Sequence, residues 1–241
     1  MNLSYTDEQN LLRDSVSKFC GSDYDFETRM KSVNSENGHN PEHWNLFAEL
    51  GWLAIPFSED LGGLDGGDVD LSLMFEEFGK SIVVEPYLAN VVLSGGVLKR
   101  SDLENKADLI EQLIAGEKQI SLANYEPKKG FNLDNVECEI SDDGTISGLK
   151  TTVLNAPNAD SFLVFGKHQS SFAFALISKG AEGSKVTPYK TYDGFVSGDL
   201  HLENCKAEAV FSKSDALEIL HQAILEGIIC VSSEAIGAME T

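Results

Sequence analysis

The spacing of apolar residues changes twice along this 241-residue chain, and these changes constrain the fold more than any other feature. Up to about residue 118, apolar side chains recur at helical spacing, as in Leu12 and Val16. From Gln119 they alternate with a period of two, and from Ser214 the helical spacing returns. The sequence therefore predicts an α+β protein with an all-helical domain at 1–117, a β domain at 118–212 and a helix at 213–241.

Start and stop signals divide the helical part. Thr6 and Gln9 form a capping box, and Asn40-Pro41 places a capping residue before a proline at the first helical position. Residues 21–40 are polar and predict a connection with a turn at Asn37-Gly38. Pro56 and repeated glycines interrupt the next stretch, which predicts an ordered apolar loop. Further helices are expected from Asp70, over 86–100 and over 104–115.

Eight short stretches of strand character follow, separated by turn residues. Asp142-Asp143-Gly144 is the clearest hairpin signal. No helix falls between these stretches and no G-x-G-x-x-G motif occurs, which excludes a Rossmann cofactor site and predicts an antiparallel barrel or sandwich. The expected strands cover 120–124, 136–140, 145–154, 162–166, 172–177, 185–189, 195–202 and 209–211.

Charge and cysteine usage narrow the class of protein. The formal net charge of −21 opposes nucleic acids and anionic membranes. The four cysteines form no C-x-x-C pair, and the histidines show no metal or catalytic-triad spacing. The N-terminus is acidic where a signal peptide would be basic, and no membrane span is expected. We therefore expect a cytoplasmic protein that holds no metal.

The final helix carries one apolar stripe and no signal that ends it. Such a stripe needs cover, so the helix is expected to pack on another subunit or on parts of the chain that are missing. The isolated chain should then self-associate or bind a hydrophobic dye. The stripe comprises Leu217, Leu220, Ile224, Ile228, Val231, Ala235 and Met239.

Two groups of motifs resemble the acyl-CoA dehydrogenases. In the β part, Y-E-P-x-x-G from Tyr125 precedes G-x-K-x-x-V-x-N ending at Asn155; in the helical part, G-W-L-x-x-P-F precedes M-x-E-E-x-G-K and V-E-P-Y-L-A. More narrowly, the helical motifs resemble the pimeloyl-CoA dehydrogenase small subunits. The resemblance implies that family's N-terminal helical domain, its middle β domain and only the first helix of its C-terminal bundle, so that the chain is truncated.

The resemblance also implies a function. Members of the family remove two hydrogens from an acyl-CoA thioester, with a glutamate as base and FAD as hydride acceptor, and pass electrons to an electron-transfer flavoprotein. Here the substrate would be an acyl- or dicarboxyl-CoA thioester, with the acyl chain beside Leu88 and Val92. In some family members the base lies on the first helix of the C-terminal bundle. Glu226 is the nearest candidate for that base, although it lies one residue away from the matching position. The implied flavin-binding positions are Tyr125, Glu126, Phe131, Val153, Leu154 and Asn155.

Several of these positions depart from the family pattern. Tyr125, Phe131 and Leu154 stand where the family commonly has hydroxyl side chains that bind the flavin. Each lost hydrogen bond is worth about 1–3 kcal/mol. The alternative is therefore a non-catalytic, flavin-poor partner subunit of a heteromeric acyl-CoA dehydrogenase, and a third hypothesis is a fragment with no function of its own.

Overall fold

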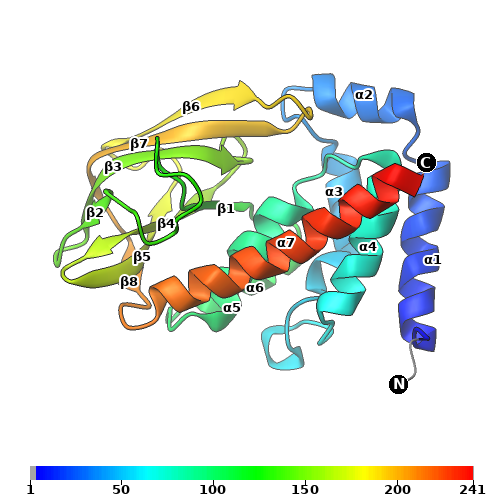
Figure 1. Cartoon of the computed structure of the whole chain (residues 1–241), viewed down its shortest axis with the longest axis horizontal. Helices are drawn as coiled ribbons and strands as arrows, with labels where there is room; N and C mark the ends of the chain where they lie inside the picture. Colours follow the sequence, from blue (N-terminus) through cyan, green and yellow to red (C-terminus); the bar gives the residue numbers. More distant parts are fainter. Residues whose placement is uncertain (1–3, 241) are drawn as a thin grey trace.

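A computed structural model describes residues 4–240, with helices at one end, a sheet at the other and the long helix α7 running along both (Figure 1). The helices are α1 (Asp7–Ser22), α2 (Phe26–Asn34), α3 (Pro41–Glu49), α4 (Asp68–Ser81), α5 (Gly95–Arg100), α6 (Lys106–Ile114) and α7 (Ala216–Glu240), with the short 3₁₀ turns η1 (Trp52–Ala54) and η2 (Glu59–Leu61) and the π-helical segment η3 (Leu88–Ser94). The strands are β1 (Ile120–Ala123), β2 (Glu139–Ile140), β3 (Thr145–Leu154), β4 (Ser161–His168), β5 (Ser171–Ser178), β6 (Ser184–Lys190), β7 (Val196–Lys206) and β8 (Ala209–Phe211). The predicted α+β class is confirmed.

The helix starts follow the sequence signals. Thr6 and Gln9 exchange both hydrogen bonds of a capping box, at 3.2 Å and 3.1 Å. The helix α3 begins at Pro41, directly after the capping residue Asn40. The Asn40 side chain accepts a hydrogen bond from the backbone N–H of Glu42. The predicted helix over 86–100 is continuous, but its first part, η3, has π geometry.

The helix α2 was missed, because the sequence analysis interpreted residues 21–40 as a polar connection. Its start is a local signal, since the Asp25 side chain accepts a bond from the Thr28 backbone N–H. Its other support is tertiary: Arg29 donates to the backbone oxygens of Ile82 and Asp193. A short polar helix of this kind is stabilised by contacts that no sequence period reports.

Aromatic side chains form the centre of the helical part. The Phe47 ring stacks on Phe78 with centroids 5.5 Å apart and lies 4.8 Å from the Trp52 ring. Trp52 comes from the loop at 51–67, and the expectation of an ordered apolar loop is confirmed by the burial of Trp52, Leu53, Ile55 and Phe57. These rings fix α3, α4 and the loop against one another.

The eight strands form one sheet in the order β6-β7-β3-β2-β4-β5-β8, with β1 added to β4. Most neighbours are antiparallel, as predicted, and the turn at Asp142–Gly144 joins the antiparallel pair β2 and β3. β4 differs, because it takes both β1 and β2 as parallel partners. The sheet is therefore mixed, which the period of two cannot reveal because pairing direction depends on the connections.

The helix α7 packs closely across α4. A Cβ atom added at Gly237 would lie 1.8 Å from the Glu76 backbone oxygen, and one at Gly79 would lie 2.0 Å from that of Glu234. Ser72 and Ser233 share a hydrogen bond of 2.8 Å at the same crossing. Small residues at these positions allow the two backbones to approach.

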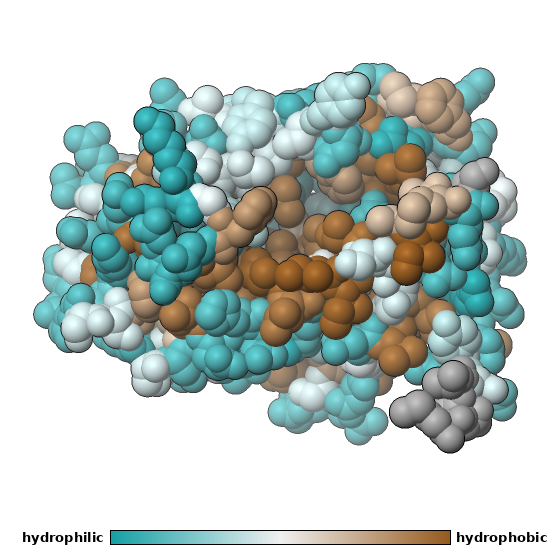
Figure 2. Space-filling view, viewed as in Figure 1, coloured by the Kyte–Doolittle hydropathy of each residue, from teal (hydrophilic) through white to brown (hydrophobic). Residues whose placement is uncertain are grey.

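The opposite face of α7 is exposed. Figure 2 shows apolar side chains gathered along this helix. By length and composition α7 could cross a membrane, which contradicts the expectation that no segment approaches a span. A single such helix is weak evidence for a span, because helices packed against a protein core have the same composition. The large apolar side chains exposed on α7 are Leu225, Ile228, Val231, Ile236 and Met239.

Candidate functional site

The two turns predicted to form one site lie together at the end of the sheet. The backbone N–H of Thr151 donates to the backbone oxygen of Tyr125 at 2.9 Å, which joins the end of β1 to β3. A bulge interrupts the β3–β7 pairing between Lys150 and Val153. Thr152 and Asn155 adopt left-handed backbone conformations there, with φ of 52° and 58°. The two turns therefore lie side by side, while their role in flavin binding stays a prediction.

The first turn is held by a buried ion pair. Glu126 accepts a bond from Lys150 Nζ at 2.7 Å and from the backbone N–H groups of Glu137 and Cys138. Burial raises the pKa of Glu126, but the charge and hydrogen bond of Lys150, together with the backbone N–H bonds from Cys138 and Glu137, outweigh burial and lower this pKa overall. Glu126 therefore fixes the framework of the turn, while Phe131, further along it, is 93% exposed.

The second turn has its polar groups engaged. The backbone N–H of Thr152 donates to the Tyr189 hydroxyl at 3.0 Å, and that of Asn155 donates to the Val196 oxygen at 2.9 Å. The Asn155 amide donates to Gln119 at 2.7 Å. Val153 is fully buried. The N–H groups of Thr152 and Asn155 and the Asn155 amide are therefore already bonded within the protein.

A cavity of about 220 Å³ lies between α4, α7, the 82–89 segment, the second turn and residues 193–196. Three of the predicted site residues line it, namely Leu88, Leu154 and Asn155. The others, Val92, Tyr125, Glu126, Phe131 and Val153, are not among its lining residues. In Figure 2 the surface is hollowed beside α7, between that helix and the sheet. The structure thus joins one predicted acyl-chain position to one of the two predicted turns.

Glu226, the predicted candidate base, lies at the contact between α5 and α7. Its carboxylate binds Lys99 Nζ at 2.9 Å and Arg100 Nη2 at 2.6 Å. Burial raises the pKa of Glu226, but the two cations outweigh burial and lower it overall. Glu226 is not among the cavity-lining residues, and its catalytic role stays a prediction without support from this geometry.

Glu234 is the glutamate of α7 that lines the cavity, whereas the sequence analysis favoured Glu226 on the same helix. Burial, reinforced by Asp193, raises the pKa of Glu234 to about 7, although Arg29 acts in the opposite direction. A carboxyl group with a pKa near neutrality in a cavity can take up and release a proton at physiological pH. In the sequence, Glu234 could have been found as an acidic residue within a stretch of mostly small residues, beside Ser233 and Gly237, which are buried in α7.

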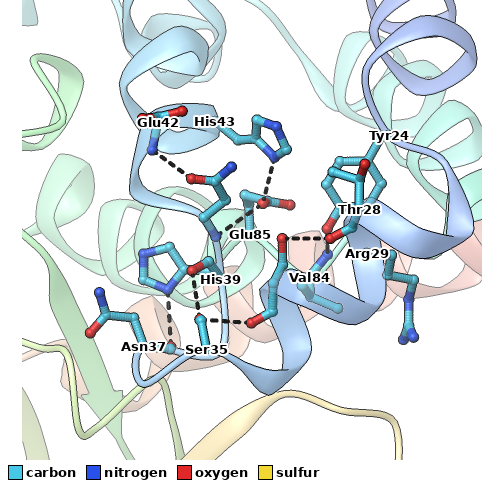
Figure 3. Close-up of polar contacts among 12 residues, drawn as sticks. Tyr24, Thr28, Arg29, Ser35, Asn37, His39, Glu42, His43, Val84 and Glu85 are labelled. Carbon is cyan, nitrogen blue, oxygen red and sulfur yellow. Dashed lines mark hydrogen bonds and ion pairs between the residues drawn. The ribbon is translucent and has the colours of Figure 1, made fainter.

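A buried polar network borders the same cavity (Figure 3). Glu85 Oε1 lies 3.2 Å from His43 Nδ1 and accepts a bond from the Asn40 backbone N–H. Its Oε2 makes no hydrogen bond with a described residue, although its charge adds to burial in raising the pKa of the Tyr24 hydroxyl. Burial lowers the pKa of His39, which also lines the cavity, so His39 is neutral at pH 7. None of the residues from 4 to 240 form a cluster suited to a metal ion.

Comparison with known proteins identifies the fold. Residues 6–117 match the family model described as acyl-CoA dehydrogenase, N-terminal domain. Acryloyl-CoA reductase (NADH) from Anaerotignum propionicum is 23% identical over all of this chain and 65% of its own length. L-prolyl-[peptidyl-carrier protein] dehydrogenase from Serratia is 28% identical over 77% of this chain and 51% of its own. The chain therefore spans one half to two thirds of these relatives.

The solved structures agree in fold. The crystal structure of the ChsE4–ChsE5 complex from Mycobacterium tuberculosis contains a chain that superposes on the present one with a TM-score of 0.84 and 24% sequence identity. The match covers all of the present chain and 65% of the chain in that complex. Both parts of the present chain, the helices and the sheet, thus have counterparts in that structure. The chain is an acyl-CoA dehydrogenase-like protein, which comprises the N-terminal helical part and the middle β part of that family's fold.

Proposed function

We propose that this chain is a non-catalytic, flavin-poor subunit of a heteromeric acyl-CoA dehydrogenase. It would bind an acyl thioester in the cavity beside α7 and pair with a second subunit through the exposed face of that helix. The main support for this proposal is the hydrogen bonding of the two turns at which the family binds FAD. Their framework residues are in place, but in the second turn the N–H groups of Thr152 and Asn155 and the Asn155 amide are engaged within the protein.

The residues present do not fit a flavin. The Thr152 and Asn155 N–H groups and the Asn155 amide are already bonded, and Leu154 offers no donor. No lysine or arginine is among the residues that line the cavity, so a diphosphate would find no counter-ion on these walls. At about 220 Å³ the cavity is also smaller than the roughly 300–1,000 Å³ typical of cofactor sites.

The apolar walls support the thioester part of the proposal. Leu88, Leu154 and Val231 face the cavity from three different segments, which suits a short acyl chain. The partner part is supported by α7, whose Ile228 and Met239 are 54% and 77% exposed. The ChsE4–ChsE5 structure is a complex of two such chains, which makes pairing of this kind reasonable. An electron-transfer flavoprotein would then dock on the catalytic partner.

A flavin-dependent dehydrogenase is the second candidate, favoured by Glu234. Its carboxyl lines the cavity with a pKa of about 7, as a general base for α,β-dehydrogenation would require. In that case FAD would accept the hydride. The narrower likeness to pimeloyl-CoA dehydrogenase small subunits, which rests on motifs such as V-E-P-Y-L-A, remains part of the proposal, as does a cytoplasmic location.

Flavin content separates these two candidates. The purified 241-residue chain should show no visible flavin absorbance and should gain none during titration with FAD. In a Phe131→Ser, Leu154→Thr double variant, two side-chain donors return, and each is worth about 1–3 kcal/mol if it reaches the ring. Stoichiometric yellow FAD on the unmodified chain would overturn the flavin-poor assignment and favour the dehydrogenase.

A further inference from the structure

We propose that the cavity beside α7 selects a short apolar group that carries a protonated amine, with the Glu234 carboxylate as its counter-ion. This inference deepens the proposed function, because it names the chemical class of the acyl group. It rests on the composition of the cavity walls, on the state of Glu234 and on the position of the nearest cation.

The walls combine apolar side chains with acidic ones. Phe75 and Phe78 of α4 and Phe195 before β7 supply aromatic surface. Among residues 4–240, the acidic residues that line the cavity are Glu85, Asp193 and Glu234, and none of these lining residues is a lysine or arginine. His39 contributes no charge at neutral pH, because burial lowers its pKa. The cavity therefore favours a cation and opposes an anion.

Glu234 is available to a ligand. Within residues 4–240, its carboxylate forms no hydrogen bond or ion pair, in contrast to Glu77 and Glu226, which each bind two cations. The cation near it, Arg29, is committed elsewhere: Nε donates to the Ile82 oxygen at 2.7 Å and Nη2 to the Asp193 oxygen at 2.9 Å. Burial of an unpaired carboxylate is unfavourable, and a ligand cation would offset that cost.

A second, fully buried carboxylate borders the same space. The Glu85 side chain has no exposed surface, and its Oε2 makes no hydrogen bond with any described residue. His43 approaches the other oxygen, as Figure 3 shows, and the Asn40 backbone N–H donates to that oxygen as well. Glu85 therefore places a buried carboxyl oxygen without a hydrogen-bond partner among the described residues at the border of the cavity.

The size of the site limits the ligand. A cavity of about 220 Å³ is too small for a drug-sized molecule but admits a small ring or a short branched chain. The aromatic walls also favour a cation placed against their ring faces. An ammonium is a compact charge with donors that suit one carboxylate, whereas a planar guanidinium suits two-point binding.

Matched amines and alcohols test the proposal directly. The 241-residue chain is titrated with cyclopentylammonium and with cyclopentanol, which share a ring but differ in charge, and binding is followed by NMR at pH 7.5. The ammonium should bind at least tenfold more tightly. Glu234→Gln should abolish that preference, whereas Glu218→Gln should preserve it, because Glu218 lies at the start of the same helix and bonds to Gln222. Equal binding of the two ligands, binding of neither, or an unchanged preference in Glu234→Gln would each overturn the proposal.

Two pantetheine thioesters separate this inference from the proposed function. One carries an amino-acyl group and the other carries its neutral, deamino counterpart. Tighter binding of the amino-acyl thioester supports both proposals. Equal binding of the two thioesters keeps the acyl-thioester function and overturns the amine preference. Binding of cyclopentylammonium but of neither thioester keeps the cation site and overturns the acyl-thioester function.

Discussion

Two glutamates on α7, about two helical turns apart, have opposite environments. Glu226 lies between Lys99 and Arg100, which hold its pKa below the ordinary value in spite of burial. Glu234 borders a cavity, and burial raises its pKa to about 7. The residue type and the helix are the same in both cases. The difference shows that the elements packed against α7 decide which carboxylate can exchange a proton near neutral pH.

The neighbours of the two halves of α7 explain this contrast. The first half packs against α5, whose last turn supplies both cations. The second half crosses α4 at Gly79 and Gly237, where the backbones approach too closely for any side chain. That close approach brings Glu234 to the edge of the cavity instead of leaving it in solvent.

The largest effect is expected from the crossing itself. Gly237→Ala would place a methyl group 1.8 Å from the Glu76 oxygen, so the two helices must separate. We expect a loss of about 3 kcal/mol in the free energy of unfolding, measured with urea. Gly21→Ala on α1 is the control, since a Cβ there meets nothing within 4 Å and alanine favours a helix. Similar stabilities for the two variants would refute the tight crossing.

A smaller effect is expected when Glu226 loses a cation. Arg100→Met removes two hydrogen bonds to the carboxylate, at 2.6 Å and 3.2 Å, and leaves only Lys99. We expect a destabilisation of about 2 kcal/mol and a pKa of Glu226 that rises toward that of Glu234. A double-mutant cycle with Glu226→Gln measures the coupling. Additive effects of the two substitutions would show that the ion pair contributes nothing.

The smallest effect is a change in pH dependence at Glu234. Because its folded pKa of about 7 exceeds the unfolded value near 4.5, its contribution to stability is complete below pH 4.5 and is lost as the pH rises to 7. Glu234→Gln should remove this loss and be more stable than the wild type at pH 8; because the Glu234 side chain is partly exposed, solvent screening reduces the expected gain to about 1.4 kcal/mol. Urea unfolding at both pH values measures the gain.

Glu226→Gln provides the opposite control for that pH series. The folded pKa of Glu226 is lowered, so its contribution is present above the unfolded pKa and is lost as the pH falls through the folded one. At high pH, Glu226→Gln should therefore be less stable than the wild type and Glu234→Gln more stable, whereas at low pH both variants should approach the wild type. Parallel curves for the two variants would remove the contrast between the two halves of α7.

Much of the fold could be predicted because its signals are local. The period of two located every strand, and the capping box at Thr6 and the Asn40-Pro41 pair fixed two helix starts. The missed helix α2 and the parallel partners of β4 share a cause, since both depend on contacts between distant segments. The domain boundaries stay a prediction.

The candidate site was predicted only in part, for the same reason. The resemblance assigned both turns to one flavin site, and in the structure a backbone bond from Thr151 to Tyr125 joins them, while their role in flavin binding stays a prediction. The motifs could not show that the N–H groups of Thr152 and Asn155 are bonded to Tyr189 and Val196, which belong to other strands. They also favoured Glu226 over Glu234, because register along one helix says nothing about which neighbours carry charge.

The sequence by itself determined the order of elements, the α+β class and the family resemblance, since hydrophobic period, caps and short motifs act over a few residues. Only the tertiary structure decided which glutamate faces a cavity and which donors remain free. A pKa and an open hydrogen-bonding site both depend on burial and on charges brought together from segments far apart in the chain, as Arg29 and Asp193 are brought to Glu234.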